Sequence, residues 1–147
     1  MKRPVLLATA LFLSSLASAQ TVIPASVERS IAMHGIQAVS AVGPEVLRVV
    51  LKAPEVSLTR FKSVVSLSMC APHWRKMPDA KGFNPQRVEV VNASQTQGYA
   101  LANPFQATCD ILGMPAPGAY LDRHTWVCTE GTPCRARKQG ERLASDQ

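Results

Sequence analysis

Aromatic side chains are scarce in this sequence, and several motifs of catalysis and membrane insertion are absent. Only 8 of the 147 residues are Phe, Trp or Tyr, so aliphatic side chains must supply most of the buried area of any core. No apolar stretch reaches the roughly 20 residues that a membrane-spanning helix needs. The chain has no Cys-x-x-Cys pair, no Gly-x-Ser-x-Gly nucleophile elbow and no phosphate-binding glycine loop. These absences argue against a thiol redox enzyme and leave an enzymatic function without motif support.

The first 19 residues have the pattern of a secretory signal peptide. Residues 1–3 (Met-Lys-Arg) are a short positive start, residues 5–16 are apolar apart from small polar side chains, and residues 17–19 (Ala-Ser-Ala) are a small-x-small cleavage site. We therefore expect cleavage near Ala19 and a periplasmic or secreted product without a transmembrane segment. The alternative is that the segment stays attached as a membrane anchor.

Four cysteines follow this segment, and an oxidising compartment favours disulfides between them. Cys128 and Cys134 enclose Thr-Glu-Gly-Thr-Pro, which can reverse direction, so we pair them and by elimination pair Cys70 with Cys109. In the loop-entropy model the small ring contributes about 2.4 kcal/mol and the large one about 3.9 kcal/mol. The metal alternative would combine Cys70-x-x-His73 with other cysteines, which is only half of a zinc signature.

Length and charge indicate one small basic domain. We predict a single domain over residues 20–134 and a basic, disordered tail over residues 135–147. Loss of the leader removes two basic residues and leaves 14 Lys and Arg against 10 Asp and Glu, a net charge of +4. Such a charge suits an anionic envelope component, although it is also common in exported domains that bind nothing acidic. The tail could alternatively act as an electrostatic tether for anionic partners.

Hydrophobic periodicity predicts one helix near the start of the mature chain. Apolar positions 27, 31, 38 and 42 share a stripe over residues 26–42, and Gly-Pro follows. Residues 44–52 (PEVLRVVLK) favour a strand because of their β-branched content, although a proline also suits a first helical position. Residues 63–70 alternate between apolar and serine side chains, which favours a strand. The apolar spacing over residues 58–69 also suits a helix, which is the alternative.

The second half of the chain is rich in turn residues and predicts strands. Residues 87–92 and 99–103 flank a short connection and indicate a hairpin. Residues 105–112 (FQATCDIL) and 119–128 (AYLDRHTWVC) follow as further strands, separated by the turn cluster GMPAPG. We therefore predict an α+β fold in which the N-terminal helix packs on a small antiparallel sheet of about four or five strands, with two disulfides.

The longest stretch without periodicity, residues 71–86 (APHWRKMPDAKGFNPQ), is the predicted binding site. Structureless loops of this length are uncommon in compact domains and are usually functional or mobile. His73, Trp74, Arg75 and Lys76 are the candidate contact residues, because an indole flanked by cations can anchor an acidic partner. The alternative is that Trp74 folds back onto the sheet and the cations are solvated.

A catalytic alternative depends on Asp122 and His124. If they lie on a strand they point to the same face, and a carboxylate beside a histidine can raise its basicity for acid–base chemistry. With His73 nearby, they would suit a small basic hydrolase directed at nucleic acid or cell-wall material. His34 is expected to be an ordinary residue in the middle of the predicted helix. Asn92 begins an Asn-Ala-Ser glycosylation pattern, which often occurs by chance.

The predicted function is that of an exported, disulfide-stabilised, non-enzymatic binding or accessory module, for example an inhibitor-like protein. It would contact a protein or an anionic envelope component through residues 71–86, because a stapled loop beside a sheet is pre-organised for binding. The small hydrolase is the alternative. We expect no cofactor and no metal, and nucleic acid is not the expected partner.

Overall fold

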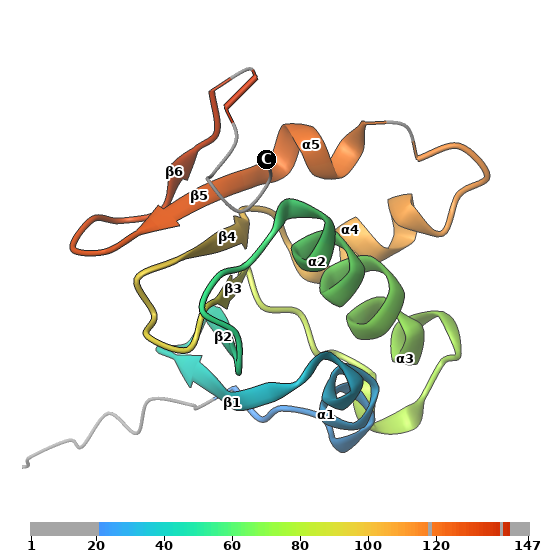
Figure 1. Ribbon diagram of the computed structural model, residues 1–147. Coiled ribbons are helices and arrows are strands. Elements are labelled where there is room, and N and C mark those ends of the chain that lie inside the picture. The colour runs from blue at the N-terminus through green and yellow to red at the C-terminus, as the bar shows by residue number, and fades with distance from the viewer. Residues whose placement is uncertain (1–20, 118, 139, 142–147) are drawn as a thin grey trace, which may run out of the picture.

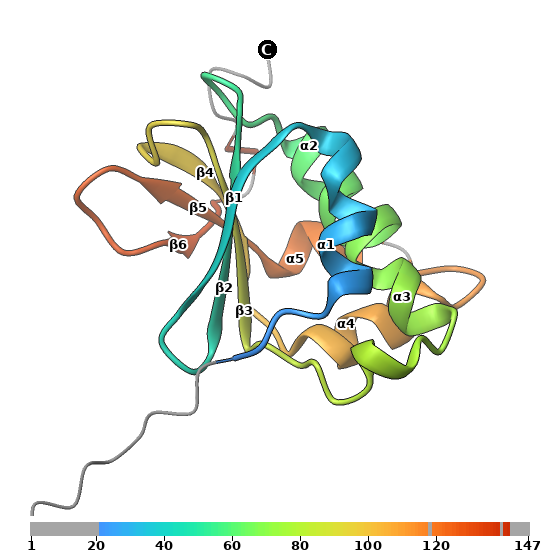
Figure 2. The ribbon, with the colours of Figure 1, turned by 90° about the horizontal axis from the view of Figure 1, so that it is seen from below.

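One sheet and one layer of helices make up the structure (Figures 1 and 2). The computed structural model describes residues 21–117, 119–138 and 140–141, so the expected leader lies outside the described residues. The helices cover one face of a six-stranded sheet with the order β1-β2-β3-β4-β5-β6. The strands are β1 (Ile36–Val42), β2 (Val46–Leu51), β3 (Arg87–Val91), β4 (Gln97–Leu101), β5 (Thr125–Thr129) and β6 (Arg135–Ala136). The predicted α+β class is confirmed.

The sheet is mixed rather than antiparallel. β2 and β3 pair in parallel, with Arg48 opposite Glu89, while the other neighbouring strands are antiparallel. The predicted antiparallel sheet of four or five strands is therefore wrong in strand number and in one pairing. Parallel neighbours need a crossover connection, and here the crossover is helical. It contains α2 (Leu58–Lys62), η2 (Ser63–Met69), α3 (Cys70–Trp74) and η3 (Pro78–Ala80).

The helix predicted over residues 26–42 is wrong in its second half. α1 (Ala25–Ile31) and the short η1 (Ala32–His34) end at Gly35, whose φ of 66° lies in the left-handed region. Glycine adopts that conformation without the steric cost of a Cβ, and it commonly ends helices. The following residues form β1, so positions 38 and 42 lie on a strand. α1 contacts η2 and α3, so its predicted packing directly on the sheet is not confirmed.

Residues 58–70 are helical, and the predicted strand over 63–70 is wrong. Ser57 begins this run, because its Oγ accepts a hydrogen bond from the Arg60 amide at 3.2 Å. Phe61, Val65 and Met69 lie four residues apart and are all fully buried, as expected for one face of a helix. The helical spacing therefore prevailed over the alternation with serine. The strand predicted over 44–52 is confirmed as β2.

The predicted hairpin is confirmed by the antiparallel pair β3 and β4. Asn92 holds its turn: Oδ1 accepts hydrogen bonds from the amides of Thr96 and Gln97, and Nδ2 donates to Pro54 O at 2.7 Å. Asn92 is 3% exposed, and its side-chain nitrogen Nδ2 already donates a hydrogen bond. The Asn-Ala-Ser pattern therefore serves the turn in this fold.

Two later predictions of strands are corrected. α4 (Phe105–Leu112) replaces the strand predicted over 105–112, and its buried residues Phe105, Thr108 and Cys109 share one helical face. The segment 119–128 is divided between α5 (Tyr120–His124) and the first part of β5. A short apolar run fits either structure, and here the position of each apolar residue against the core decided between them.

The core lies between the sheet and the helices. β2, β3 and β4 contribute alternate residues, β5 contributes Val127, and the helices contribute one face each. Phe61 of α2 packs against Tyr99 of β4, with ring centroids 5.7 Å apart. Both predicted disulfides are confirmed: Cys70–Cys109 joins α3 to α4, and Cys128–Cys134 closes the β5–β6 connection.

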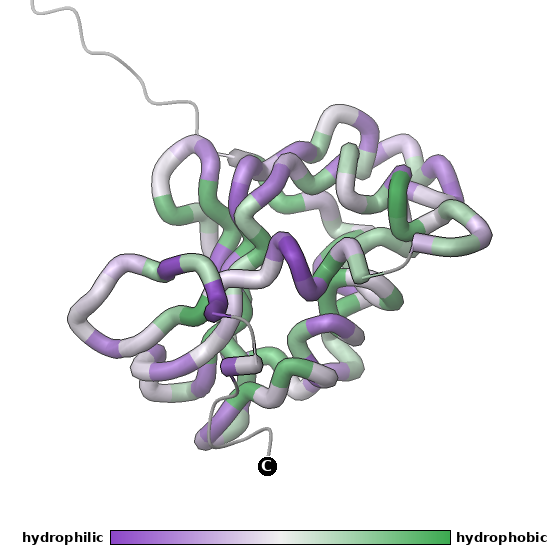
Figure 3. Tube along the Cα trace, turned by 90° about the horizontal axis from the view of Figure 1, so that it is seen from above, coloured by the Kyte–Doolittle hydropathy of each residue, from purple (hydrophilic) through white to green (hydrophobic). Residues whose placement is uncertain are grey.

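The described part of the chain has no helix that is long and apolar enough to cross a membrane. Apolar and polar residues are interspersed along the trace (Figure 3).

At the C-terminal end, the segment predicted to be a disordered tail starts with strand β6, which pairs with β5. Arg137, which follows β6, forms an ion pair with Asp122 at 3.2 Å. Residues 139 and 142–147 lie outside the described residues.

Candidate functional site

The segment predicted as a binding loop is partly helical. Residues 71–74 complete α3, a turn follows, η3 occupies Pro78–Ala80, and the rest leads into β3. Lys76 ends the helical run with a φ of 53°, a left-handed conformation that is uncommon outside glycine. α3 therefore ends here, and the chain turns back toward η3, exposing Arg75 and Lys76.

Trp74 is anchored on α4 and does not lie on the sheet. Its Nε1 donates a hydrogen bond to the carbonyl oxygen of Cys109 at 2.7 Å. Gly113, just after α4, leaves room for the ring: a Cβ there would come within 3.0 Å of the Trp74 Nε1. The side chain is half-buried, and the residue stays 40% exposed. Trp74 therefore has a fixed position and an accessible face.

His73 and Asp110 form a pair that sequence reasoning missed. His73 Nε2 lies 2.7 Å from Asp110 Oδ1, across 37 residues of sequence. The side chains are 27% and 65% exposed, so the pair lies at the surface. The predicted Cys70–Cys109 bridge carried a signal for this contact, because His73 lies one helical turn after Cys70 and Asp110 directly follows Cys109.

Positively charged side chains without an ion pair gather around this segment. Arg29 of α1 and the segment's own Arg75, Lys76 and Lys81 make no ion pair with any residue that the structure describes. The nearby Asp79 carries a negative charge, and its Oδ2 accepts a hydrogen bond from the Ser26 amide at 2.8 Å. This hydrogen bond, with Arg29 as a further cause, holds the pKa of Asp79 below its usual range. Arg29 is far from this segment in sequence and reaches it only through the packing of α1, so no sequence signal pointed to it.

Three surface hollows follow one another along residues 71–85. The first, of about 260 Å³, lies between α1 and α3 and includes Arg29 and Arg75. The second, also of about 260 Å³, includes His73, Lys76 and Lys81, and it shares Pro72 and Met77 with the first.

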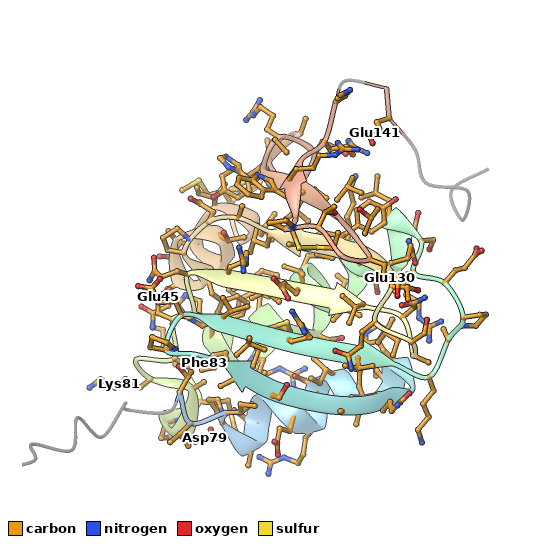
Figure 4. All side chains as sticks on the ribbon, turned by 90° about the vertical axis from the view of Figure 1, so that its left-hand side faces the viewer. Glu45, Asp79, Lys81, Phe83, Glu130 and Glu141 are labelled. Atoms are coloured by element: carbon orange, nitrogen blue, oxygen red, sulfur yellow. A yellow bond between two sulfur atoms is a disulfide. The ribbon has the colours of Figure 1, made fainter. Side chains whose placement is uncertain are left out.

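The third hollow, of about 540 Å³, shares Lys81 and Gly82 with the second and extends past Phe83. Figure 4 shows Asp79, Lys81 and Phe83 at this end, beside the sheet. We call the continuous surface formed by residues 71–85 and Arg29 the basic track. Its lining combines the cations with proline, alanine and methionine side chains, and the acid Asp79 lines the third hollow.

The geometry required by the catalytic alternative is not formed. Asp122 and His124 lie two residues apart on the helix α5, where such positions do not face each other. Asp122 instead pairs with Lys62 at 2.7 Å and with Arg137, and the hydrogen bond from Lys62 lowers its pKa. His124 packs against Tyr120, with ring centroids 4.4 Å apart. The predicted common face of Asp122 and His124 is therefore wrong.

A second charged cluster lies on the sheet face that has no helices. Glu89, with a side chain that is 3% exposed, accepts from Arg48 at 2.8 Å and pairs with Arg87 at 3.0 Å. Arg48 and Glu89 face each other across β2 and β3, and this ion pair is compatible with the parallel register, while the buried Arg87 Nε has an ion-pair contact without a well-formed hydrogen bond. Over the described residues no group of three or more His, Cys, Asp or Glu side chains could hold a metal ion.

Comparison with known proteins adds no identity to this geometry. No family model matches the chain, and neither the curated proteins nor the solved structures contain a significant match.

Proposed function

We propose that this protein is an exported, non-enzymatic binding module that holds an extended anionic chain on the basic track. The observation that carries the proposal is the succession of hollows along residues 71–85, lined by four cations that lack ion-pair partners among the described residues. An extended partner could place successive carboxylate or phosphate groups in neighbouring hollows. An acidic protein segment and an anionic envelope polymer both have this chemistry.

Rigidity of the basic track supports this function. The Cys70–Cys109 disulfide and the Trp74 hydrogen bond fix α3 on α4, while the Asp79 carboxylate fixes η3 on α1 through the Ser26 amide. A surface that is ordered before binding loses little conformational entropy when the partner arrives. The cations on this frame would therefore contribute to affinity without first being brought together.

Charge and exposure support an acidic partner. Arg75 and Lys76 are exposed, so their attraction for an anion acts at long range and accelerates association. The Trp74 ring lies beside them with an accessible face and can pack against an aliphatic or sugar portion of the partner. Export is supported by the leader pattern and by two disulfides, which persist in oxidising compartments.

The experiment compares two charge-reversal variants. Arg75→Glu/Lys76→Glu alters the basic track, and Lys52→Glu/Arg123→Glu alters exposed cations elsewhere by the same net charge. Fluorescently labelled poly-L-glutamate and polyphosphate serve as separate probes, and anisotropy gives the Kd of each. We expect the track variant to bind at least one probe about tenfold more weakly than the control variant, and its affinity to depend less on salt.

The two probes distinguish the chemical source of the anion. Preference for poly-L-glutamate indicates an acidic protein segment, and preference for polyphosphate indicates a phosphate-bearing polymer. Equal losses in both variants would contradict the proposal, because general attraction to a basic protein would then explain the binding. Hydrolysis of RNA or cell-wall material that His124→Ala removes would favour the catalytic alternative instead.

A further inference from the structure

The two edges of the sheet differ in their protection. β6 has two residues, and the cations Arg135, Arg137 and Lys138 lie on it or directly after it. β1, at the opposite edge, has seven residues, IQAVSAV, without a charge or a proline. Sheets usually guard an exposed edge with charges, proline or short length, because unpaired backbone groups attract another strand. β1 lacks all three of these devices.

The outer side of β1 has no strand beside it among the described residues. β1 pairs with β2 on its inner side, and no other strand of the described sheet borders it. Gln37, Ala38, Ser40 and Val42 are exposed, and from Ala38 to Val42 exposed and half-buried residues alternate. The only irregularity in its pairing with β2 lies near one end, between Ile36 and Ala38. Residues 38–42 are therefore a regular, uncharged edge.

Exposed apolar side chains lie at both ends of this edge. Met33, which is 82% exposed, precedes β1 by three residues, and Val42, which is 41% exposed, ends it. Val22 is 83% exposed and lies near the same end as Val42, because the neighbouring Thr21 hydroxyl donates to Pro44 O at 2.7 Å. Such large apolar side chains at the two ends of an open strand mark a surface that gains free energy when it is covered.

We propose that β1 pairs antiparallel with β1 of a second copy of this chain, so that the two sheets become one. A two-fold axis near Val39 would place Ile36 opposite the partner's Val42, and Ala38 opposite the partner's Ser40. No charge would then face a like charge, which favours pairing of this strand with itself. The same axis brings Met33 of each copy toward the partner's Val42 and Val22, so the apolar ends cover one another.

A second copy fits the edge because the arrangement closes on itself. In a two-fold contact the same patch serves both subunits, and each apolar end of β1 meets the opposite end. The pairing is independent of the proposed function. If both hold, the dimer carries two basic tracks, and an anionic chain long enough to reach both would bind with higher avidity than it binds one.

The first experiment adds charge to the edge. The oxidised mature protein is studied by sedimentation equilibrium over a wide concentration range, beside Ala38→Lys/Ser40→Lys and the control Thr59→Lys/Ala116→Lys. All four positions are exposed, so the variants should fold, and circular dichroism checks this. We expect the wild type and control to have twice the monomer mass, and the edge variant to dimerise at least about tenfold more weakly because introduced lysines face one another.

The second experiment tests the register directly. Ala38→Glu/Ser40→Glu should also be monomeric alone, but an equimolar mixture with Ala38→Lys/Ser40→Lys should form a heterodimer in which acids face bases. Native mass spectrometry gives the composition of each species. A wild type that is monomeric throughout, a dimer that the edge charges leave unchanged, a mixture that stays monomeric, or a foreign polypeptide found on the edge would each overturn the proposal.

Discussion

The indole of Trp74 and the backbone of Cys109 are joined at 2.7 Å, beside the disulfide that ends at the same cysteine. One residue of α4 thus holds α3 twice, through its sulfur and through its carbonyl oxygen. The carbonyl also accepts from the Gly113 amide at 3.0 Å. It therefore keeps a partner when the indole is removed.

Trp74→Phe tests how much the hydrogen bond from the indole to the Cys109 carbonyl stabilises the fold. The variant keeps an aromatic ring but loses the donor, so we expect the free energy of unfolding to fall by about 0.5–1.5 kcal/mol. Trp126→Phe is the control, since Trp126 forms no side-chain hydrogen bond with the described residues and is also partly buried. Urea titrations give both values. An equal loss in the two variants would assign the effect to ring size rather than to the hydrogen bond.

The disulfides should differ in what they contribute. The Cys70–Cys109 pair spans 39 residues and the Cys128–Cys134 pair spans 6. In the loop-entropy model, double serine replacement should cost about 3.9 kcal/mol for the first pair and about 2.4 kcal/mol for the second. Chemical denaturation without reductant measures both. Equal costs, or a larger cost for the small ring, would contradict this order.

Asp122 should make stability depend on pH in the acid range. The Lys62 hydrogen bond first, and Arg137 second, hold its pKa in the folded protein below the usual value of about 3.9. Its stabilising contribution is therefore present above about pH 4 and is lost as the pH falls through the folded pKa. Asp122→Asn should flatten the loss of stability between about pH 5 and pH 2.

The control for this measurement is Glu130→Gln. Glu130 is exposed and makes no ion pair within the described parts of the chain, so its replacement removes a carboxyl group without breaking an ion pair. Thermal unfolding at successive pH values gives both slopes. If Asp122→Asn keeps the wild-type slope, the ion pairs with Lys62 and Arg137 are not coupled to folding.

His34 should make stability depend on pH in a higher range than Asp122 does. Burial, and then the charge of Arg60, lower its pKa in the folded protein below the usual value of about 6.5. The unfolded chain then takes up a proton first as the pH falls, so stability should decrease below about pH 6.5 and level off beneath the folded pKa. The neutral ring also meets Ser68 Oγ at 2.7 Å.

His34→Gln removes this titration and should flatten the stability profile between about pH 7 and pH 5. His124→Gln is the matched control, since it removes a different histidine. The unfolding midpoint is followed by circular dichroism across this range. A profile that His124→Gln flattens and His34→Gln leaves intact would reject the assignment.

Sequence reasoning succeeded where contacts are local. Cys128 and Cys134 close a short turn, the hairpin of β3 and β4 joins neighbours, and the disulfide of Cys70 with Cys109 followed by elimination. It failed where tertiary contacts decide between two periods. Residues 58–70 and 105–112 are short apolar runs that fit a strand or a helix, and burial against the sheet selected the helix.

The candidate site was likewise predicted only in its local part. The absence of periodicity and the three prolines marked residues 71–86, and the hollows lie along this segment. Arg29 and the contact of His73 with Asp110 depend on how α1, α3 and α4 pack. That packing follows from the parallel pairing of β2 and β3, which needs a helical crossover between them. Because part of this crossover was predicted to be a strand, the sequence could not show that these residues lie together.

The Cys70–Cys109 bridge makes a covalent ring of residues 70–109. All of the basic track except Arg29 lies inside this ring, so a protease that cuts one peptide bond between residues 71 and 86 would leave both ends linked through sulfur. The cut chain could not lose either half of the surface. A nicked molecule should therefore stay in one piece under oxidising conditions, heavier only by the water taken up in hydrolysis, and separate into two pieces only after reduction.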